Sequence, residues 1–267
     1  RRRGVHERSE PALTLLQEER LASPEAMIPD ERLRLLFACA HPAIDPSLHA
    51  PLMLQCVLGY DAVAIGWAFA VAPATMGQRL VRAKGKIRAA GIPFAVPGPE
   101  ALDERVPPVL DAIYAAFGLS WDNVLGRRDL CDEALWLAEL LTRLLPEAAE
   151  ALGLRSLMLY SHARRGARRA PGGAFVPLEA QDTSRWELPL LERAEALLSR
   201  AAALGKPGRY QLEAAIQAVH TDRARTGRTD WDALVALYRG LLAFAPTLGT
   251  ICGFAAVLDR VGRSVEA

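Results

Sequence analysis

The amino-acid sequence predicts an all-α protein, in which a small helix-turn-helix domain is followed by an array of helical hairpins. Of its 267 residues, 51% are hydrophobic and 6% aromatic, which is typical of a packed globular chain. Alanine, leucine, arginine and glutamate dominate while β-branched residues are sparse, so helices are favoured over strands. Apolar residues also recur at steps of three and four along most of the chain.

The first part of the chain predicts a linker followed by four short helices. Residues 1–29 mix charged residues with serine and proline, a composition typical of a linker. Asp30 and Asp61 are suitable N-caps, and Gly59 and Gly91 suitable ends. The expected helices run from Asp30 to before Pro42, from Ser47 to Leu58, from Asp61 to Phe69 and from Ala74 to about Ala90. We assign 30–94 to one domain.

The second part predicts a longer helical region. The segment PFAVPGP at 93–99 cannot continue a helix, so we place a boundary there. Periodic apolar segments cover 102–118, 129–145, 147–165, 184–204, 208–225, 230–244 and 247–260. Ser184 and Glu187 have the spacing of a capping box, which predicts a helix start. Trp231, Leu234 and Tyr238 have the spacing that opens a tetratricopeptide repeat. We therefore expect residues 100–267 to form a tetratricopeptide-like extension.

The segment ATMGQRLVRAKGKIRAAGI, at 74–92, combines an apolar face with a basic face. Met76, Leu80, Ala83 and Ile87 recur at helical spacing, and Thr75, Gln78, Arg79, Arg82 and Lys86 fall on the opposite side. The segment holds five cations and no acid, although the net charge of the whole chain is only +1. A helix, a tight turn and a basic helix follow the order of a DNA-binding helix-turn-helix. The alternative is an amphipathic helix whose cations face only water.

Several other classes of protein are not indicated. The four cysteines form no C-x-x-C pair, and Cys39 with His41 lacks a second pair that would complete a metal site, so we expect reduced, buried thiols and no metal. No paired carboxylates, catalytic triad or phosphate loop is apparent, so we expect neither an enzyme nor a cofactor. No uncharged apolar stretch of about 18 residues occurs, and we expect a cytoplasmic protein without membrane contact.

Two further groups of residues have structural interpretations. The arginines of SHARRGARRA could bind nucleic acid, but they lie where a helix is expected to end, and there cations complement the helix dipole. The cluster consists of Arg164, Arg165, Arg168 and Arg169. His162 and His220 have no neighbouring acid or nucleophile in a catalytic pattern, so we expect both to be structural.

Four motifs taken together resemble a bacterial RNA polymerase sigma factor of the extracytoplasmic-function class, in the group with a long helical C-terminal extension. They are DERLRLLFACAHPAI at 30–44, ATMGQRLVRAKGKIRAAGIPF at 74–94, QDTSRW at 181–186 and GKPGRYQLEAAIQAVH at 205–220. The resemblance implies that 30–94 is sigma region 4. In that family, region 4 binds the promoter −35 element and docks on core RNA polymerase.

The resemblance implies roles for individual residues. It places Thr75, Gln78, Arg79 and Arg82 on bases and backbone of the DNA, with Lys84, Lys86 and Arg88 near phosphates. It implies that Leu33, Leu36 and Phe37 face the polymerase, although such residues in a small domain are more often core. It also implies that the extension regulates the front half, through an intramolecular contact with the helix-turn-helix.

The sequence departs from the family in three ways. No aromatic-rich, basic helical segment precedes residue 30, so we expect region 2, which melts the −10 element, to be absent from this chain. Gly66, Gly77 and Gly85 lie inside expected helices and predict a loosened DNA-binding unit. Ala64 and Trp67 stand where the family carries polar residues. An alternative function is therefore a protein-interaction module, in which the extension binds a partner and the helix-turn-helix is a remnant.

Overall fold

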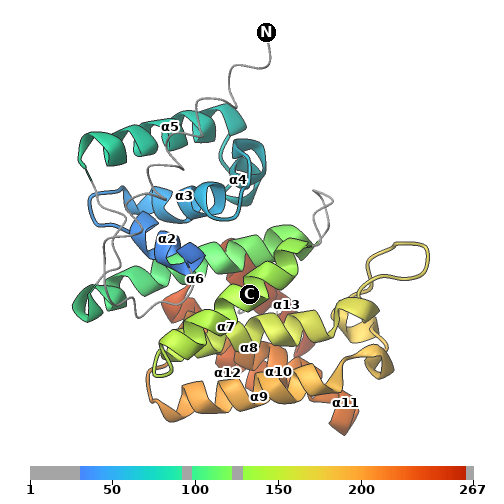
Figure 1. Cartoon of the computed structure of the whole chain (residues 1–267). Coiled ribbons are helices and arrows are strands. Elements are labelled where there is room, and N and C mark those ends of the chain that lie inside the picture. The colour runs from blue at the N-terminus through green and yellow to red at the C-terminus, as the bar shows by residue number, and fades with distance from the viewer. Residues whose placement is uncertain (1–30, 92–97, 122–128, 263–267) are drawn as a thin grey trace.

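The protein is built from helices that pack in successive pairs. The computed structural model describes residues 31–91, 98–121 and 129–262. Within these ranges the chain forms α-helices, short 3₁₀ segments and no strand, which confirms the predicted all-α class (Figure 1). The expected linker at 1–29 and the N-cap Asp30 lie outside the described residues.

The front unit contains the four helices expected there, with one difference. Its elements are α2 (Glu31–Cys39), η2 (Pro46–Leu48), α3 (His49–Cys56), α4 (Ala62–Ala68) and α5 (Pro73–Ala89). The helix expected from Ser47 to Leu58 is divided into η2 and α3, because Asp45 accepts a hydrogen bond from the Ser47 backbone N–H and caps a 3₁₀ turn. Asp61 caps α4 through the N–H of Ala64 at 2.8 Å, as predicted.

The extension begins with α6, which enters at Pro99. Its helices are α6 (Pro99–Trp121), α7 (Asp129–Leu144), α8 (Ala149–Ala163), α9 (Leu188–Ala203), α10 (Arg209–Thr221), α11 (Arg223–Thr226), α12 (Trp231–Phe244) and α13 (Leu248–Arg260). Three 3₁₀ turns, η3 (Arg165–Ala167), η4 (Leu178–Ala180) and η5 (Thr183–Arg185), lie between α8 and α9.

The predicted capping box at Ser184 and Glu187 is wrong. Ser184 lies inside η5, where Asp182 accepts a hydrogen bond from its backbone N–H at 2.9 Å. Helix α9 begins only at Leu188, with a proline in its first turn and no side-chain cap. The aspartate ahead of Ser184 therefore formed a shorter, local turn in competition with the helix start.

One hydrophobic core runs through the front unit and the first helices of the extension. Helix α6 lies against α2 and α3, across the expected boundary (Figure 1). The Tyr60 hydroxyl on the front unit donates to the carbonyl of Ala116 in α6 at 3.2 Å. The Arg32 guanidinium pairs with Glu133 of α7 at 2.5 Å and lies 4.4 Å from the ring centre of Trp136. The extension thus packs directly on the helix-turn-helix unit.

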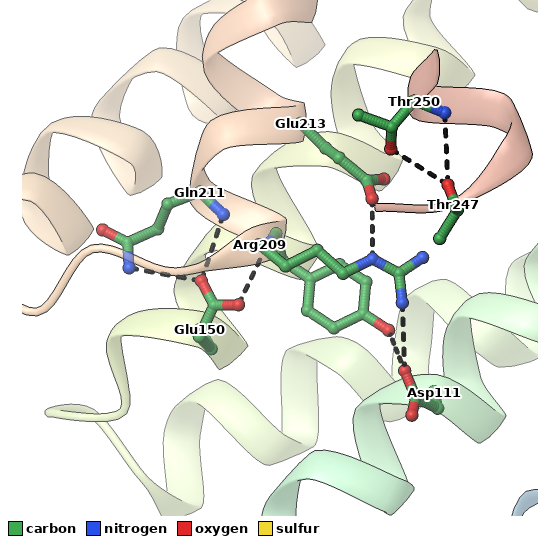
Figure 2. A network of polar contacts seen from close by, with 8 residues as sticks. Asp111, Glu150, Arg209, Gln211, Glu213, Thr247 and Thr250 are labelled. Atoms are coloured by element: carbon green, nitrogen blue, oxygen red, sulfur yellow. Dashed lines mark hydrogen bonds and ion pairs between the residues drawn. The ribbon is translucent and has the colours of Figure 1, made fainter. Parts of the chain in front are cut away.

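The motif GKPGRYQLEA holds α10 against α6 and α8 (Figure 2). The Arg209 side chain bonds Glu213 at 2.7 Å and reaches Asp111 of α6 at 3.5 Å. The Tyr210 hydroxyl donates to the same Asp111 carboxylate at 2.6 Å. This side-chain network explains why Arg209 and Tyr210 stand together at the start of α10.

Glu150 of α8 caps the N-terminus of α10. Its carboxylate accepts from the backbone N–H groups of Tyr210 at 2.8 Å and Gln211 at 3.1 Å. A carboxylate at a helix N-terminus satisfies free backbone donors and complements the helix dipole. The approach requires glycine on both sides, since a Cβ on Gly153 would lie 2.7 Å from the Gln211 nitrogen, and one on Gly208 would overlap the Glu150 carboxyl.

The motif QDTSRW fastens the segment between α8 and α9 to α11. Arg223 donates to the backbone carbonyls of Leu178, Glu179 and Gln181 and lies 5.4 Å from the ring centre of Trp186. Arg164 of the basic cluster is buried and donates to the carbonyl of Tyr160 at the end of α8, as well as to Gln217. Burial lowers the pKa of Arg164 to about 10. Arg164 therefore stabilises the fold.

None of the described helices is both long enough and apolar enough to cross a membrane.

Candidate nucleic-acid interface

A sharp turn joins α4 to α5 and sets the angle between them. The Val71 N–H donates to the carbonyl of Gly66 at 2.9 Å, and Ala70 takes a left-handed conformation with φ of 51°. Pro73 then occupies the first turn of α5, where the missing N–H costs nothing. A Cβ on residue 66 would lie 2.6 Å from the Val71 carbonyl oxygen.

The predicted loosening of this unit is therefore wrong at Gly66. Glycine is required there because α4 approaches the turn too closely for a Cβ. The lower helix propensity of Gly66 is therefore the condition for a close packing contact. Gly77 and Gly85 differ, since a Cβ on Gly77 would make only an ordinary contact with Ala62 and one on Gly85 would meet nothing within 4 Å.

Helix α5 is anchored by one face and open on the other. Met76, Leu80 and Ala83 are buried against the front unit, as their spacing predicted. The residues predicted to contact DNA are all exposed; they are Thr75, Gln78, Arg79, Arg82, Lys84, Lys86 and Arg88. The structure therefore leaves all seven of these α5 residues accessible to solvent.

The cations of α5 form no side-chain hydrogen bonds or ion pairs within the described part of the chain. They are Arg79, Arg82, Lys84, Lys86 and Arg88. The helix contains no acid. The charge of Arg79 contributes to a lowered pKa of the Asp45 carboxyl, after the hydrogen bonds from Ser47 and the charge of His49. Such a surface attracts phosphate oxygens.

The three residues that the resemblance assigned to the polymerase lie in the core. Leu33, Leu36 and Phe37 each have 0% exposed surface. They belong to the core cluster that α6 shares with the front unit, in agreement with the alternative interpretation of these residues as core. A docking role for these side chains would require α6 to leave α2 and α3.

Large apolar side chains are exposed on the helix-turn-helix itself. Val63 and Trp67 of α4 are 52% and 78% exposed, and Val81 of α5 is 71% exposed. A shallow hollow of about 460 Å³ lies over α5 and is lined by Ala74, Gly77, Gln78, Val81 and Arg82. The family resemblance singled out Trp67, because it stands where the family carries a polar residue, but it did not single out Val81. Val81 lies away from the periodic apolar face of α5, and this position predicts its exposure.

The cysteines only partly follow the expectation of buried thiols. Cys39 and Cys131 are buried, whereas Cys56 and Cys252 are exposed. A hydrogen bond from the Cys39 thiol, together with the charge of Lys84, lowers the pKa of Cys56 to about 7 against the opposing effect of desolvation. The same pairing raises the pKa of Cys39. His41 accepts from the Ala43 N–H instead of joining Cys39.

Comparisons with known proteins find one family model and one curated relative that are similar to parts of this chain. Residues 105–202, from α6 into α9, match the model of the family DUF6596, described as a family of unknown function. A protein of Rhizobium meliloti (strain 1021), described as uncharacterized, is 40% identical over 222 residues, which are 82% of this chain and 52% of that protein. The chain thus spans about half the length of this relative. No solved structure matches the chain. Residues 105–202 of the extension are therefore similar to DUF6596.

Proposed function

We propose that this chain is the −35-binding part of a sigma factor of the extracytoplasmic-function class, acting in the cytoplasm with core RNA polymerase. The observation that carries the proposal is the exposed face of α5, whose cations have no partner in the described structure while its apolar face is anchored in the core. Gln78 and Arg79 would meet base edges, and Lys84, Lys86 and Arg88 would meet phosphates.

The position of the last two cations has a second explanation. Lys86 and Arg88 lie in the final turn of α5, where cations complement the helix dipole. That effect is worth about 0.3–1 kcal/mol at an exposed helix end. It does not apply to Arg79 and Arg82, which lie nearer the middle of the helix, so these two arginines provide the cleaner test.

The test is titration of fluorescent −35-type duplexes with the full chain at several salt concentrations. Arg79→Ala and Arg82→Ala should each weaken binding by about 1–3 kcal/mol if they contact bases, or reduce the salt slope by about one if they contact phosphate. Arg193→Ala removes an exposed cation from α9 and is the matched control, which should leave binding unchanged. Absence of binding, or equal affinities for all three variants, would contradict the proposal.

Docking on the polymerase then requires a surface other than Leu33, Leu36 and Phe37. Val63 and Trp67 are one helical turn apart on the exposed side of α4, and exposed apolar patches mark interaction sites. Trp67→Ala should reduce retention of core RNA polymerase on the immobilised chain, without lowering its affinity for free duplex. Trp136→Ala is the control. It removes an aromatic ring of α7 that lies beside Arg32, and this variant should retain polymerase.

A second candidate is a protein-interaction module centred on the end of the extension. Phe244, Leu248 and Ile251, at the junction of α12 and α13, are 52%, 78% and 49% exposed. In this case Leu248→Lys with Ile251→Lys should release a partner protein from the full chain while duplex binding persists. A partner that stays bound to this double variant would argue against the candidate.

A further inference from the structure

The outermost line of α5 is uncharged rather than basic. At about 3.6 residues per turn, the positions opposite Met76 and Leu80 are Ala74, Gln78, Val81 and Gly85. All four are exposed. The cations lie beside this line instead of on it.

The flanking cations fall on both sides of this line. Arg79, Arg82 and Lys86 follow one flank, and Lys84 and Arg88 follow the other. The major groove of DNA is bordered by two phosphate backbones and admits a single α-helix. A helix that is basic on both flanks and uncharged along its central line fits this groove. Its cations can reach both backbones while the residues of the central line approach the bases.

Valine is an unexpected residue at position 81. Its side chain is 71% exposed, and its helix propensity is lower than that of the charged residues around it. Neither the core nor the helix requires an apolar, β-branched residue at this position. Val81 lines the hollow on α5 together with Ala74 and Gly77, and Gly85 leaves open space on the following turn.

We propose that Val81 reads the C5-methyl group of a thymine in the major groove, so that an A·T base pair faces this position. Thymine is the base that presents an apolar group in that groove. Gln78 precedes Val81 by three residues, so the two side chains are neighbours on one side of the helix. Gln78 would then bind the adenine of an adjacent A·T pair. The inference rests on the proposed function and specifies the DNA sequence it selects.

The experiment uses the full chain and duplexes selected by it from a randomised pool. Each thymine of the selected duplex is replaced singly by deoxyuridine, which removes only the methyl group. One replacement should raise the Kd of the natural chain about fourfold, the effect of burying one methyl group. In Val81→Ala the same replacement should have no effect, and in Val81→Ile the effect should persist.

Val63→Ala is the matched control, because it truncates an exposed valine on α4 and should leave the thymine effect intact. The inference is overturned if no deoxyuridine replacement weakens binding, or if the effect is undiminished in Val81→Ala. Failure to bind any duplex overturns the proposed function as well, whereas binding without a methyl effect overturns this inference alone.

Discussion

The arginines of the extension and those of α5 occupy opposite environments in the same chain. Arg155, Arg164, Arg209 and Arg223 each bond described side chains or carbonyls and hold helices or loops together. Arg79 and Arg82 are exposed on α5 and bond no described side chain. A cation with protein partners is explained by the fold, whereas a surface of cations without described partners faces solvent and is open to an anionic ligand.

Removing one arginine from each region should therefore change the free energy of unfolding by very different amounts. Arg209→Ala removes the ion pair with Glu213 and the Arg209 contact with Asp111, which keeps its hydrogen bond from Tyr210. It should lower the free energy of unfolding by about 1.5–3 kcal/mol. Arg82→Ala should change it by less than about 0.5 kcal/mol. Urea denaturation followed by circular dichroism measures both. Equal losses of stability would remove the distinction between the two regions.

Glycine substitutions test the same contrast through packing. Gly153→Ala places a Cβ 2.7 Å from the Gln211 nitrogen, so α8 and α10 must separate, at a cost of about 1–3 kcal/mol. Gly85→Ala enters open space on α5 and should stabilise the protein by up to about 1 kcal/mol. The shift of the urea midpoint should accordingly change sign between the two variants. A destabilising Gly85→Ala would show that the outer face of α5 is covered in solution.

The sequence was sufficient to predict the helices and their buried faces, but not how distant segments meet. Met76, Leu80 and Ala83 follow a local period, and the structure buries them as that period requires. The burial of Leu33 depends on α6, more than sixty residues away, which no local pattern specifies. Gly66 was misinterpreted for the same reason, because the cost of its glycine is local while its necessity comes from the turn at Val71.

His220 should make the stability of the extension depend on pH. Burial, aided by the charges of Arg164 and Arg223, lowers its pKa from 6.5 to about 4. The unfolded chain therefore takes up a proton as the pH falls below about 6.5, while the folded chain does so only near 4. Stability should be constant above this interval and decrease within it, by at most about 1.4 kcal/mol per pH unit.

Denaturation at pH 7, 6 and 5 measures this dependence. His220→Gln should lose stability less steeply over the interval, and the difference between the two proteins isolates the contribution of His220. Parallel curves for the two proteins would mean that His220 is protonated equally in the folded and unfolded chains. Duplex binding by α5 should be unaffected by this substitution, provided that both proteins remain folded.

The smallest expected effect concerns the thiol of Cys56, in the front unit. With a pKa of about 7, this exposed thiol should react with iodoacetamide at a rate that reaches half its maximum near neutral pH. Cys39→Ser weakens the hydrogen bond that lowers this pKa, since a hydroxyl replaces the neighbouring thiol, and should change the midpoint measurably. The exposed Cys252 in α13 is the internal reference, resolved by peptide mass spectrometry. A Cys56 midpoint unaffected by Cys39→Ser would show that the two thiols do not interact. A shift would place Cys56 under the control of its buried neighbour and of Lys84, the one cation of α5 whose field reaches both thiols of the front unit.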